Sequence, residues 1–201
     1  MSFRGLTKLD AINSALTSAG GSPISSLTGS LSKDAAVALI VFDEVDREVQ
    51  ARGWHWNTDT DVVIMPDTNG FLLVPADALH VDSLTFSATS DVVIRGDRLF
   101  DRGRNTDVFN GDLHCVVVRR LDFESIPSAA RDYISARVSR ELQMRVLSDP
   151  QKDAYLASRV RDAWAGLLIE DLNSSDQRDV DNDLGQRAFR STPWFRSGGR
   201  T

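Results

Sequence analysis

Cysteine is almost missing from this chain, which has one, Cys115, among 201 residues. A single cysteine excludes a disulfide within the chain and fits either a reducing compartment or a protein that needs no such bond. No apolar run approaches the roughly 18 residues of a membrane span, and the opening stretch MSFRGLTKLD lacks the apolar core of a signal peptide. We therefore expect a protein that is made and used in solution, without a membrane anchor.

An excess of positive charge is missing too. The formal net charge is -6 and the isoelectric point is about 5.0. Proteins that bind nucleic acid concentrate lysine and arginine on one face to neutralise phosphates. The excess of acidic residues therefore argues against nucleic-acid binding. With 41% hydrophobic and 26% charged residues, the composition is otherwise that of a globular protein able to bury a sizeable core.

The motifs of common enzymes are also missing. The sequence contains no Walker A loop, dinucleotide glycine fingerprint, nucleophile elbow or paired metal histidines. His55, His80 and His114 are scattered along the chain. His114 and Cys115 are neighbours on a predicted strand, so their side chains should point to opposite faces and not share a zinc ion. We expect no cofactor and no metal.

Two groups of acidic residues imitate functional sites. One resembles the start of a calcium loop and consists of Asp179, Asp181 and Asp183. It departs from that loop because Arg190 stands where the bidentate glutamate belongs, so we interpret it as a solvated segment. The other is Asp122 with Glu124, which could form the carboxylate pair of a glycosidase. Because acidic residues at this point also favour the dipole of a following helix, we interpret them as structural.

Apolar residues at helical spacing predict helices on both sides of a central region. The expected helices run from residue 9 to 19, from 33 to 52, from Pro127 onward, and from Pro150 to near Leu172. The first ends at Gly20 and Gly21, and Gly53 is expected as the C′ residue of the second. The second has an apolar stripe of Val37, Ile40, Val41, Val45 and Val49, opposite a polar face of Asp43, Asp46, Arg47 and Gln50.

Between the helices the pattern changes to short strands separated by turn residues. DVVIM (61–65) and FLLV (71–74) flank PDTNG and predict a hairpin. DVVIR (91–95) and RLFDR (98–102) flank Gly96-Asp97 and predict a tighter one. Residues 80–86 and 113–121 predict two further strands. Such a series is typical of an antiparallel β-sandwich or small barrel.

The order of these elements predicts an α+β fold with three parts. Residues 1–56 and 122–172 form a discontinuous helical bundle from the N- and C-terminal helices, and residues 57–121 form the inserted β domain. Residues 173–201 have no sustained period and are expected to be an extended C-terminal tail that orders on binding. Its candidate interface residues are Phe189, Arg190, Trp194, Phe195 and Arg196.

Two tryptophans stand where the helical pattern gives way to the strand pattern. Trp54 and Trp56 flank His55 directly after Gly53. A buried aromatic side chain brings about 150 to 250 Å² of contact. We interpret the pair as a structural junction that joins the bundle to the insertion, in preference to a ligand cage.

Several segments together resemble the tail tubular protein A family of short-tailed bacteriophages (podoviruses). The segments are SPISSL, VFDEVDREVQARGWHWNT, MPDTNGFLLVPADALHVD, VIRGDRLFDR and IPSAARDYISARVSRELQMR. The resemblance covers the chain from about residue 11 to residue 145, and its most specific piece is REVQARGWHWNT followed by PDTNGFLLVP.

The resemblance implies a structural virion protein without catalytic residues. Family members are head-to-tail adaptors or gatekeepers that form a dodecameric ring between the portal protein and the tail nozzle protein, tail tubular protein B. Tail fibres are a further expected partner, and genomic DNA passes through the ring during ejection without specific binding. The resemblance also implies synthesis in the host cytoplasm and a place in the virion tail. From its own aromatic and arginine residues, we expect the C-terminal tail to dock on a neighbouring subunit or the portal.

Two other functions stay open from the residues themselves. A phage tail protein can also be a hydrolase of cell-wall or capsular glycan, which requires two carboxylates about 5 to 10 Å apart in a cleft. The chain can also be an oligomeric interaction module unrelated to virions. A gene for a portal or nozzle protein next to the gene for this chain would exclude the interaction module unrelated to virions.

Overall fold

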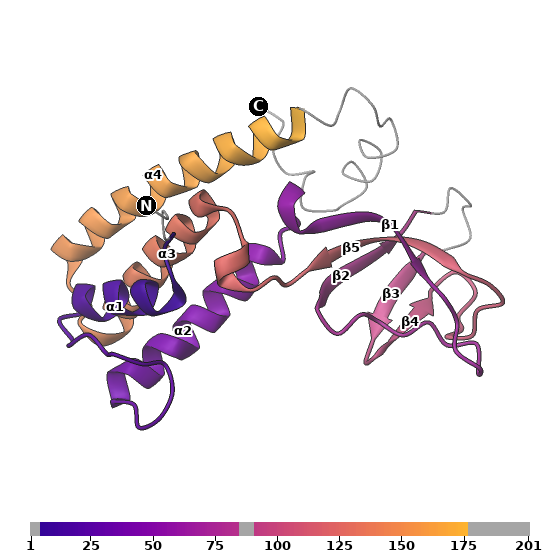
Figure 1. Cartoon of the computed structure of the whole chain (residues 1–201), viewed down its shortest axis with the longest axis horizontal. Helices are drawn as coiled ribbons and strands as arrows, with labels where there is room; N and C mark the ends of the chain where they lie inside the picture. Colours follow the sequence, from indigo (N-terminus) through magenta and orange to yellow (C-terminus); the bar gives the residue numbers. More distant parts are fainter. Residues whose placement is uncertain (1–4, 85–90, 177–201) are drawn as a thin grey trace. The chain divides into compact units, whose positions relative to one another are not determined.

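A computed structural model describes residues 5–84 and 91–176 (Figure 1). The chain divides into two compact units, each treated by itself below. Met1–Arg52 and Leu121–Leu172 form the helical unit, and Gly53–Arg120 form the β unit. N-terminal helices pack with C-terminal helices, and small antiparallel sheets are inserted between them in the sequence. The predicted α+β fold is confirmed.

The helical unit contains the four predicted helices (Figure 1). They are α1 (Lys8–Ser18), α2 (Lys33–Gln50), α3 (Ser128–Val146) and α4 (Pro150–Asp176). Three of these helices have a side-chain N-cap. Thr7, Ser32 and Asp149 accept hydrogen bonds from backbone N–H groups in the first turns of α1, α2 and α4. Thr7 and Asp10 form a complete capping box at α1.

Three helix ends differ from the expectation. Pro127 is the N-cap of α3 and not its first helical residue. Gly53 has a φ of +72°, but α2 already ends at Gln50 with Ala51 as its cap, so Gly53 lies beyond the C′ position. Helix α4 continues past Leu172 to Asp176, because no glycine or proline follows to end it.

The core of the helical unit is centred on α3, which packs against α1 and α2. Phe42 of α2 meets Phe123 edge to face, with ring centroids 5.1 Å apart. The expected polar face of α2 is partly wrong, because Asp46 and Gln50 are buried while Ile40 is exposed. The turn that follows the strands supplies polar partners for Gln50, as described below, and this allows the amide to lie inside.

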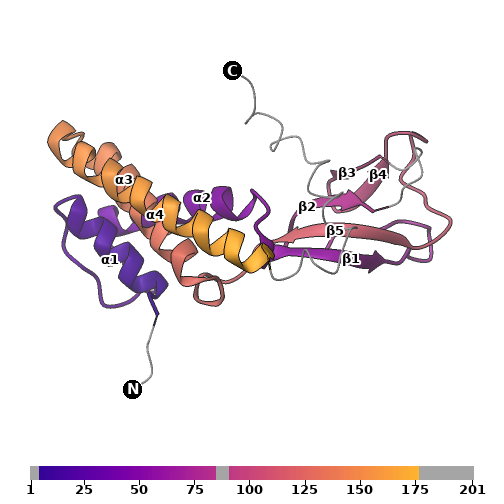
Figure 2. The same cartoon turned by 90° about the horizontal axis from the view of Figure 1, so that it is seen from above.

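The β unit contains two small antiparallel sheets. In the larger one, β5 (Leu113–Arg119) lies between β1 (Thr58–Ile64) and β2 (Ala78–Ser83), as Figure 2 shows. The smaller one pairs β3 (Val92–Arg95) with β4 (Arg98–Asp101). Both sheets cover one apolar core, made of Ile64, Leu72, Val81, Val92, Leu99, Phe109, Leu113, Cys115 and Val117.

The tighter predicted hairpin is confirmed and the first one is wrong. Arg95 pairs with Arg98 across the turn at Gly96, whose φ is +67°. Strand β1 pairs with β5, while Phe71 and Leu73 make only isolated bridges to Val108 and Arg98. In the expected turn PDTNG, the Asp67 carboxylate accepts hydrogen bonds from the N–H groups of Asn69 and Phe71. The turn itself therefore forms, but the segment after it bridges to Val108 and Arg98 and not to β1.

Candidate functional site

The segment after Gly53 makes a tight turn within the β unit. Trp54 is buried and precedes the short 3-10 helix η1 (His55–Asn57). The Asn57 side chain accepts a hydrogen bond from the Trp54 N–H at 2.8 Å and donates one to the Arg119 carbonyl at 2.8 Å. A side chain on Gly53 would begin 3.1 Å from the Val118 methyl group. Asn57 therefore locks this turn onto the end of β5.

The two tryptophans differ in their surroundings. Trp54 is buried and Trp56 is half-buried, and the indole nitrogen of Trp56 is covered without a hydrogen-bond partner among the described residues. That the pair joins the bundle to the insertion remains a prediction. Asn57 was not predicted as part of this turn, although an asparagine directly after the tryptophans is a residue type that bonds to nearby backbone.

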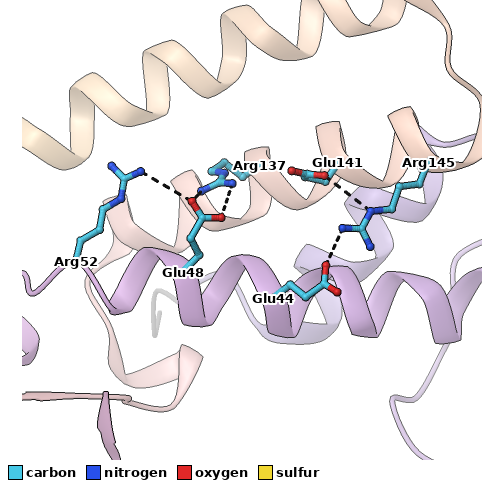
Figure 3. A network of polar contacts seen from close by, with 6 residues as sticks. All are labelled: Glu44, Glu48, Arg52, Arg137, Glu141 and Arg145. Carbon is cyan, nitrogen blue, oxygen red and sulfur yellow. Dashed lines mark hydrogen bonds and ion pairs between the residues drawn. The ribbon is translucent and has the colours of Figure 1, made fainter. Parts of the chain in front are cut away.

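A line of charged side chains connects α2 and α3 in the helical unit (Figure 3). Arg137 donates two hydrogen bonds of 2.9 Å to the Glu48 carboxylate, and Arg52 lies 4.0 Å from the same carboxylate. About one turn away on α2 and two turns away on α3, Arg145 donates to Glu44 at 2.7 Å and lies 3.9 Å from Glu141. We call these six residues the α2–α3 charge network.

The α2–α3 charge network is suited to fastening helices and not to proton transfer. The hydrogen bonds from Arg137 lower the pKa of Glu48, and the same bonds raise the pKa of Arg137. Both groups therefore stay charged around neutral pH, whereas a general acid or base needs a pKa near the working pH. Side chains as exposed as Glu48 and Arg145 contribute only modestly to stability and are screened by salt.

Gln50 forms a buried polar clamp at the end of α2. Its amide nitrogen donates to the Asp46 carboxylate at 2.9 Å and to the Leu121 carbonyl at 3.0 Å. Its amide oxygen accepts from the Leu121 N–H at 2.8 Å. The clamp holds together the two places where the chain leaves and re-enters the helical unit. Its residues were missed because α2 periodicity alone assigns Asp46 and Gln50 to the surface.

The candidate glycosidase carboxylates have structural surroundings. Glu124 lies in the 3-10 helix η2 (Phe123–Ser125) and accepts a hydrogen bond of 2.9 Å from the Lys8 N–H. This bond satisfies a free donor at the first residue of α1, so Glu124 supports α1 and not the α3 that follows it. The Asp122 carbonyl accepts from the Ser125 N–H within η2. The geometry gives Glu124 a capping role.

His114 and Cys115 point to opposite sides of β5, as expected. His114 is exposed and its Nδ1 meets the Asp61 carboxylate, while Cys115 is fully buried. Burial raises the pKa of the Cys115 thiol to about 12, so it is not a reactive thiolate at neutral pH. Within residues 5–84 and 91–176, no three histidine, cysteine or acidic side chains are grouped to hold a metal ion.

Exposed apolar side chains occur in both units. They are Val63, Met65, Leu73, Ile94 and Val108 in the β unit, and Ile40, Met144, Val146, Leu147, Tyr155, Leu168, Ile169 and Leu172 in the helices. Scattered ones are normal, but groups of them mark surfaces that another molecule covers. None of the helices in the described part is long and apolar enough to cross a membrane.

The candidate interface residues of the C-terminal tail and the acidic run lie outside the described residues. They are Asp179, Asp181, Asp183, Phe189, Arg190, Trp194, Phe195 and Arg196. In the part that the structure describes, the polar side chains named above close turns, cap helices and fasten neighbours.

Comparison with known proteins identifies which structural protein family this is. The chain matches the family model described as "Tail tubular protein" over residues 9–175. It belongs to the tail tubular protein family, and it is therefore a structural component of a phage tail, located in the virion. Members of this family are typically not enzymes. No curated protein matches the chain.

Proposed function

We propose that this tail protein forms a closed dodecameric ring that acts as the adaptor between the portal and the tail nozzle protein, tail tubular protein B. The observation that carries the proposal is the family match over residues 9–175. A protein of a tail tube repeats around a channel, and identical subunits close a ring through head-to-tail contacts between two different patches. Tail fibres are a further proposed partner.

Several contacts hold the helical unit together as a building block for such a ring. The α2–α3 charge network connects two helices and the Gln50 clamp joins α2 to Leu121, in addition to the core around α3. The acidic charge of -6 suits a channel protein, because walls without a basic patch do not hold DNA through phosphate contacts. Genomic DNA then passes without specific binding.

The C-terminal tail has a proposed role as a docking segment. Phe189, Trp194 and Phe195 offer aromatic anchors, and Arg190 and Arg196 offer positive charge within an acidic protein. We place this segment against a neighbouring subunit or the portal, because aromatic and arginine side chains dominate binding at protein interfaces. In the same proposal, Trp54 and Trp56 act within the subunit as a junction.

A reconstruction of the intact tail tests the adaptor proposal. We expect electron cryomicroscopy to show this chain as a dodecameric ring around the DNA channel, with the portal on one side and the nozzle protein on the other. Quantitative mass spectrometry of purified particles gives an independent copy number relative to the portal. A single copy, or a position on the outside of the tail, would contradict the adaptor role while leaving the family unchanged.

A further inference from the structure

Two chain crossings connect the inserted β unit with the helical unit, one at each end of the insertion. The chain leaves the helical unit between Arg52 and Gly53 and returns to it between Arg120 and Leu121. Helices pack on helices and strands pair with strands, so each unit has its own buried core. Units with separate cores commonly turn relative to each other, and a few residues at the connections absorb that motion.

At the first crossing, Arg52 is held by the helical unit. Its N–H donates to the Val49 carbonyl at 3.4 Å, which extends the end of α2. Its guanidinium group lies 4.0 Å from the Glu48 carboxylate and 5.1 Å from the centre of the Trp164 ring on α4. The backbone and the side chain of Arg52 therefore both stay with the helices.

Trp54, two residues further on, is held by the β unit. Its N–H donates to the Asn57 side chain at 2.8 Å, and the Asn57 amide donates to the Arg119 carbonyl at the end of β5. Gly53 alone stands between these two attachments. Its φ is +72°, in the left-handed region where glycine, which lacks a Cβ, moves more freely than other residues. The backbone rotations of Gly53 are therefore available to a motion between the two units.

The second crossing is equally short. The Arg120 N–H donates to the Asp77 carbonyl at 2.7 Å, which holds it to the β unit. The next N–H group, that of Leu121, donates to the Gln50 side chain at 2.8 Å, and the Leu121 carbonyl accepts from the same amide at 3.0 Å. The attachment of the backbone therefore changes from one unit to the other within one residue, and the rotations of Arg120 lie between the two.

We infer that Gly53 and Arg120 form a hinge about which the β unit turns, as a rigid body, relative to the helical unit. Two pivots in place of one restrict the motion to a turn about the line that joins them. Gln50 and Asn57 keep the pivots short, because each side-chain amide fixes backbone groups of one unit up to the crossing. The hinge belongs to the single chain and goes beyond the proposed ring. It allows the β unit to adjust to a partner while the helical unit keeps its place.

Distances between spin labels on the full chain test the hinge. One pair spans the units, with Ile40→Cys in the helical unit and Leu73→Cys in the β unit. Two control pairs stay within a unit, Ile40→Cys with Leu147→Cys and Leu73→Cys with Val63→Cys. All four side chains are exposed. Cys115 is fully buried and its thiol pKa is raised to about 12, so it does not take up the label at neutral pH. Pulsed electron paramagnetic resonance gives the distribution of each distance.

Two matched glycine variants locate the pivot. Gly53→Asn introduces a residue that tolerates the left-handed region but has less backbone freedom than glycine. Gly96→Asn makes the same change in the β3–β4 turn, where φ is +67° and a Cβ meets nothing within 4 Å. We expect the pair across the units to have a wider distribution than both control pairs. Gly53→Asn should narrow it, and Gly96→Asn should leave all three distributions as in the wild type.

A side chain on Gly53 also crowds the Val118 methyl group, 3.1 Å away. Gly53→Asn combined with Val118→Ala therefore repeats the test with that space opened, should the single variant fail to fold. Val118→Ala alone is its control and should leave the distribution across the units as wide as in the wild type.

Three results would overturn the hinge. A distribution across the units as narrow as those of the control pairs shows that the units are fixed, as a rigid junction at Trp54 and Trp56 would fix them. A wide distribution that Gly53→Asn leaves unchanged places the pivot elsewhere in the chain. Control distributions as wide as the one across the units show that a unit itself changes shape, so that no rigid body turns.

Discussion

Helices α3 and α4 follow each other in the sequence, but they bury very different numbers of residues in the subunit. Helix α3 has 19 residues, of which nine are buried. Helix α4 has 27 residues, and Leu156 and Leu167 are the fully covered ones in its described part. Length therefore does not show which helix holds a subunit together. The contrast indicates that α3 contributes more of the buried core of the single chain than α4 does.

Small and polar residues on α3 explain how it reaches the centre. Ala130, Ala136, Ser135 and Ser139 are buried there, and small side chains let neighbouring helices approach closely. The Ser139 hydroxyl donates to the Ser135 carbonyl at 2.9 Å, so it is not left unsatisfied inside. Ile134, Val138 and Leu142 supply the large apolar side chains of the same buried face.

The largest loss of stability is expected on removing a buried tryptophan outside α4. Trp54→Ala should lower the free energy of unfolding by about 3 to 5 kcal/mol, because Trp54 is almost fully covered. Trp164→Ala in α4 should cost clearly less, since Trp164 is only half-buried. Urea denaturation of the isolated subunit measures both. Should Trp54→Ala melt like the wild type and yet fail to join the tail, Trp54 is an interface residue and not part of the junction.

Matched leucines compare α3 and α4 directly. Leu142 of α3 is fully buried, so Leu142→Ala should cost about 2 to 5 kcal/mol. Leu168→Ala on α4 removes the same atoms at a side chain that is 37% exposed, so it should cost the isolated subunit less, about 1 kcal/mol. The measurement is made at protein concentrations where the chain is monomeric. Equal losses at the two sites would remove the distinction between the two helices.

The Gln50 clamp should have an intermediate effect. Gln50→Ala leaves the Leu121 backbone groups and the Asp46 carboxylate without their shared partner, and an unsatisfied buried group costs about 1 to 3 kcal/mol. Gln151→Ala serves as the glutamine control. Gln151 is an exposed residue of α4, so this change should leave the stability nearly unaltered. Thermal melting and amide exchange at Leu121 report the change. Unaltered protection of the Leu121 amide in Gln50→Ala would show that the clamp is not formed in solution.

The α2–α3 charge network should give the smallest effect, and one that depends on pH. Glu48→Gln should cost about 0.2 to 1 kcal/mol at pH 7, the range of exposed pairs. Arg137 lowers the pKa of Glu48 below its ordinary 4.5 in the folded state. The stabilisation is therefore present above 4.5 and is lost as the pH falls through the lowered value.

Melting curves of the wild type and Glu48→Gln between pH 7 and pH 3 check this dependence. The two proteins should differ most at neutral pH and low salt, and converge in acid or in high salt. Glu141→Gln should do less, because Glu141 lies 3.9 Å from Arg145 and forms no close pair with it. A difference between wild type and Glu48→Gln that is constant with pH would mean that the pair does not form.

Local patterns predicted most of the fold correctly. Apolar spacing identified all four helices, and the Gly96-Asp97 turn identified the β3–β4 hairpin. Both depend on residues close in the sequence. The pairing of β1 was predicted wrongly because its partner, β5, is about 50 residues away, and no local turn specifies that choice. The turn at Asp67 formed, but Phe71 and Leu73 after it bridge to Val108 and Arg98 and not to β1.

Site residues were harder to predict than helices. The tryptophan pair was noticed because of its position, but Asn57, which locks the turn onto β5, was not. Asp46 and Gln50 were assigned to the surface, since helical periodicity counts them as polar. Their burial depends on the Leu121 backbone, 71 residues further along. Glu124 was linked to the wrong helix for the same reason, because its hydrogen-bond partner is Lys8.

By itself, the sequence determined where the helices lie, that strands are inserted between them, and the family to which the chain belongs. Capping residues, apolar spacing and turn residues act over a few positions, so they can be recognised in one dimension. Only the tertiary structure decided that β5 lies between β1 and β2, that Gln50 is buried, and that α4 keeps an outward apolar face. These features depend on contacts between residues far apart in the chain, and such contacts form only when the whole core is packed.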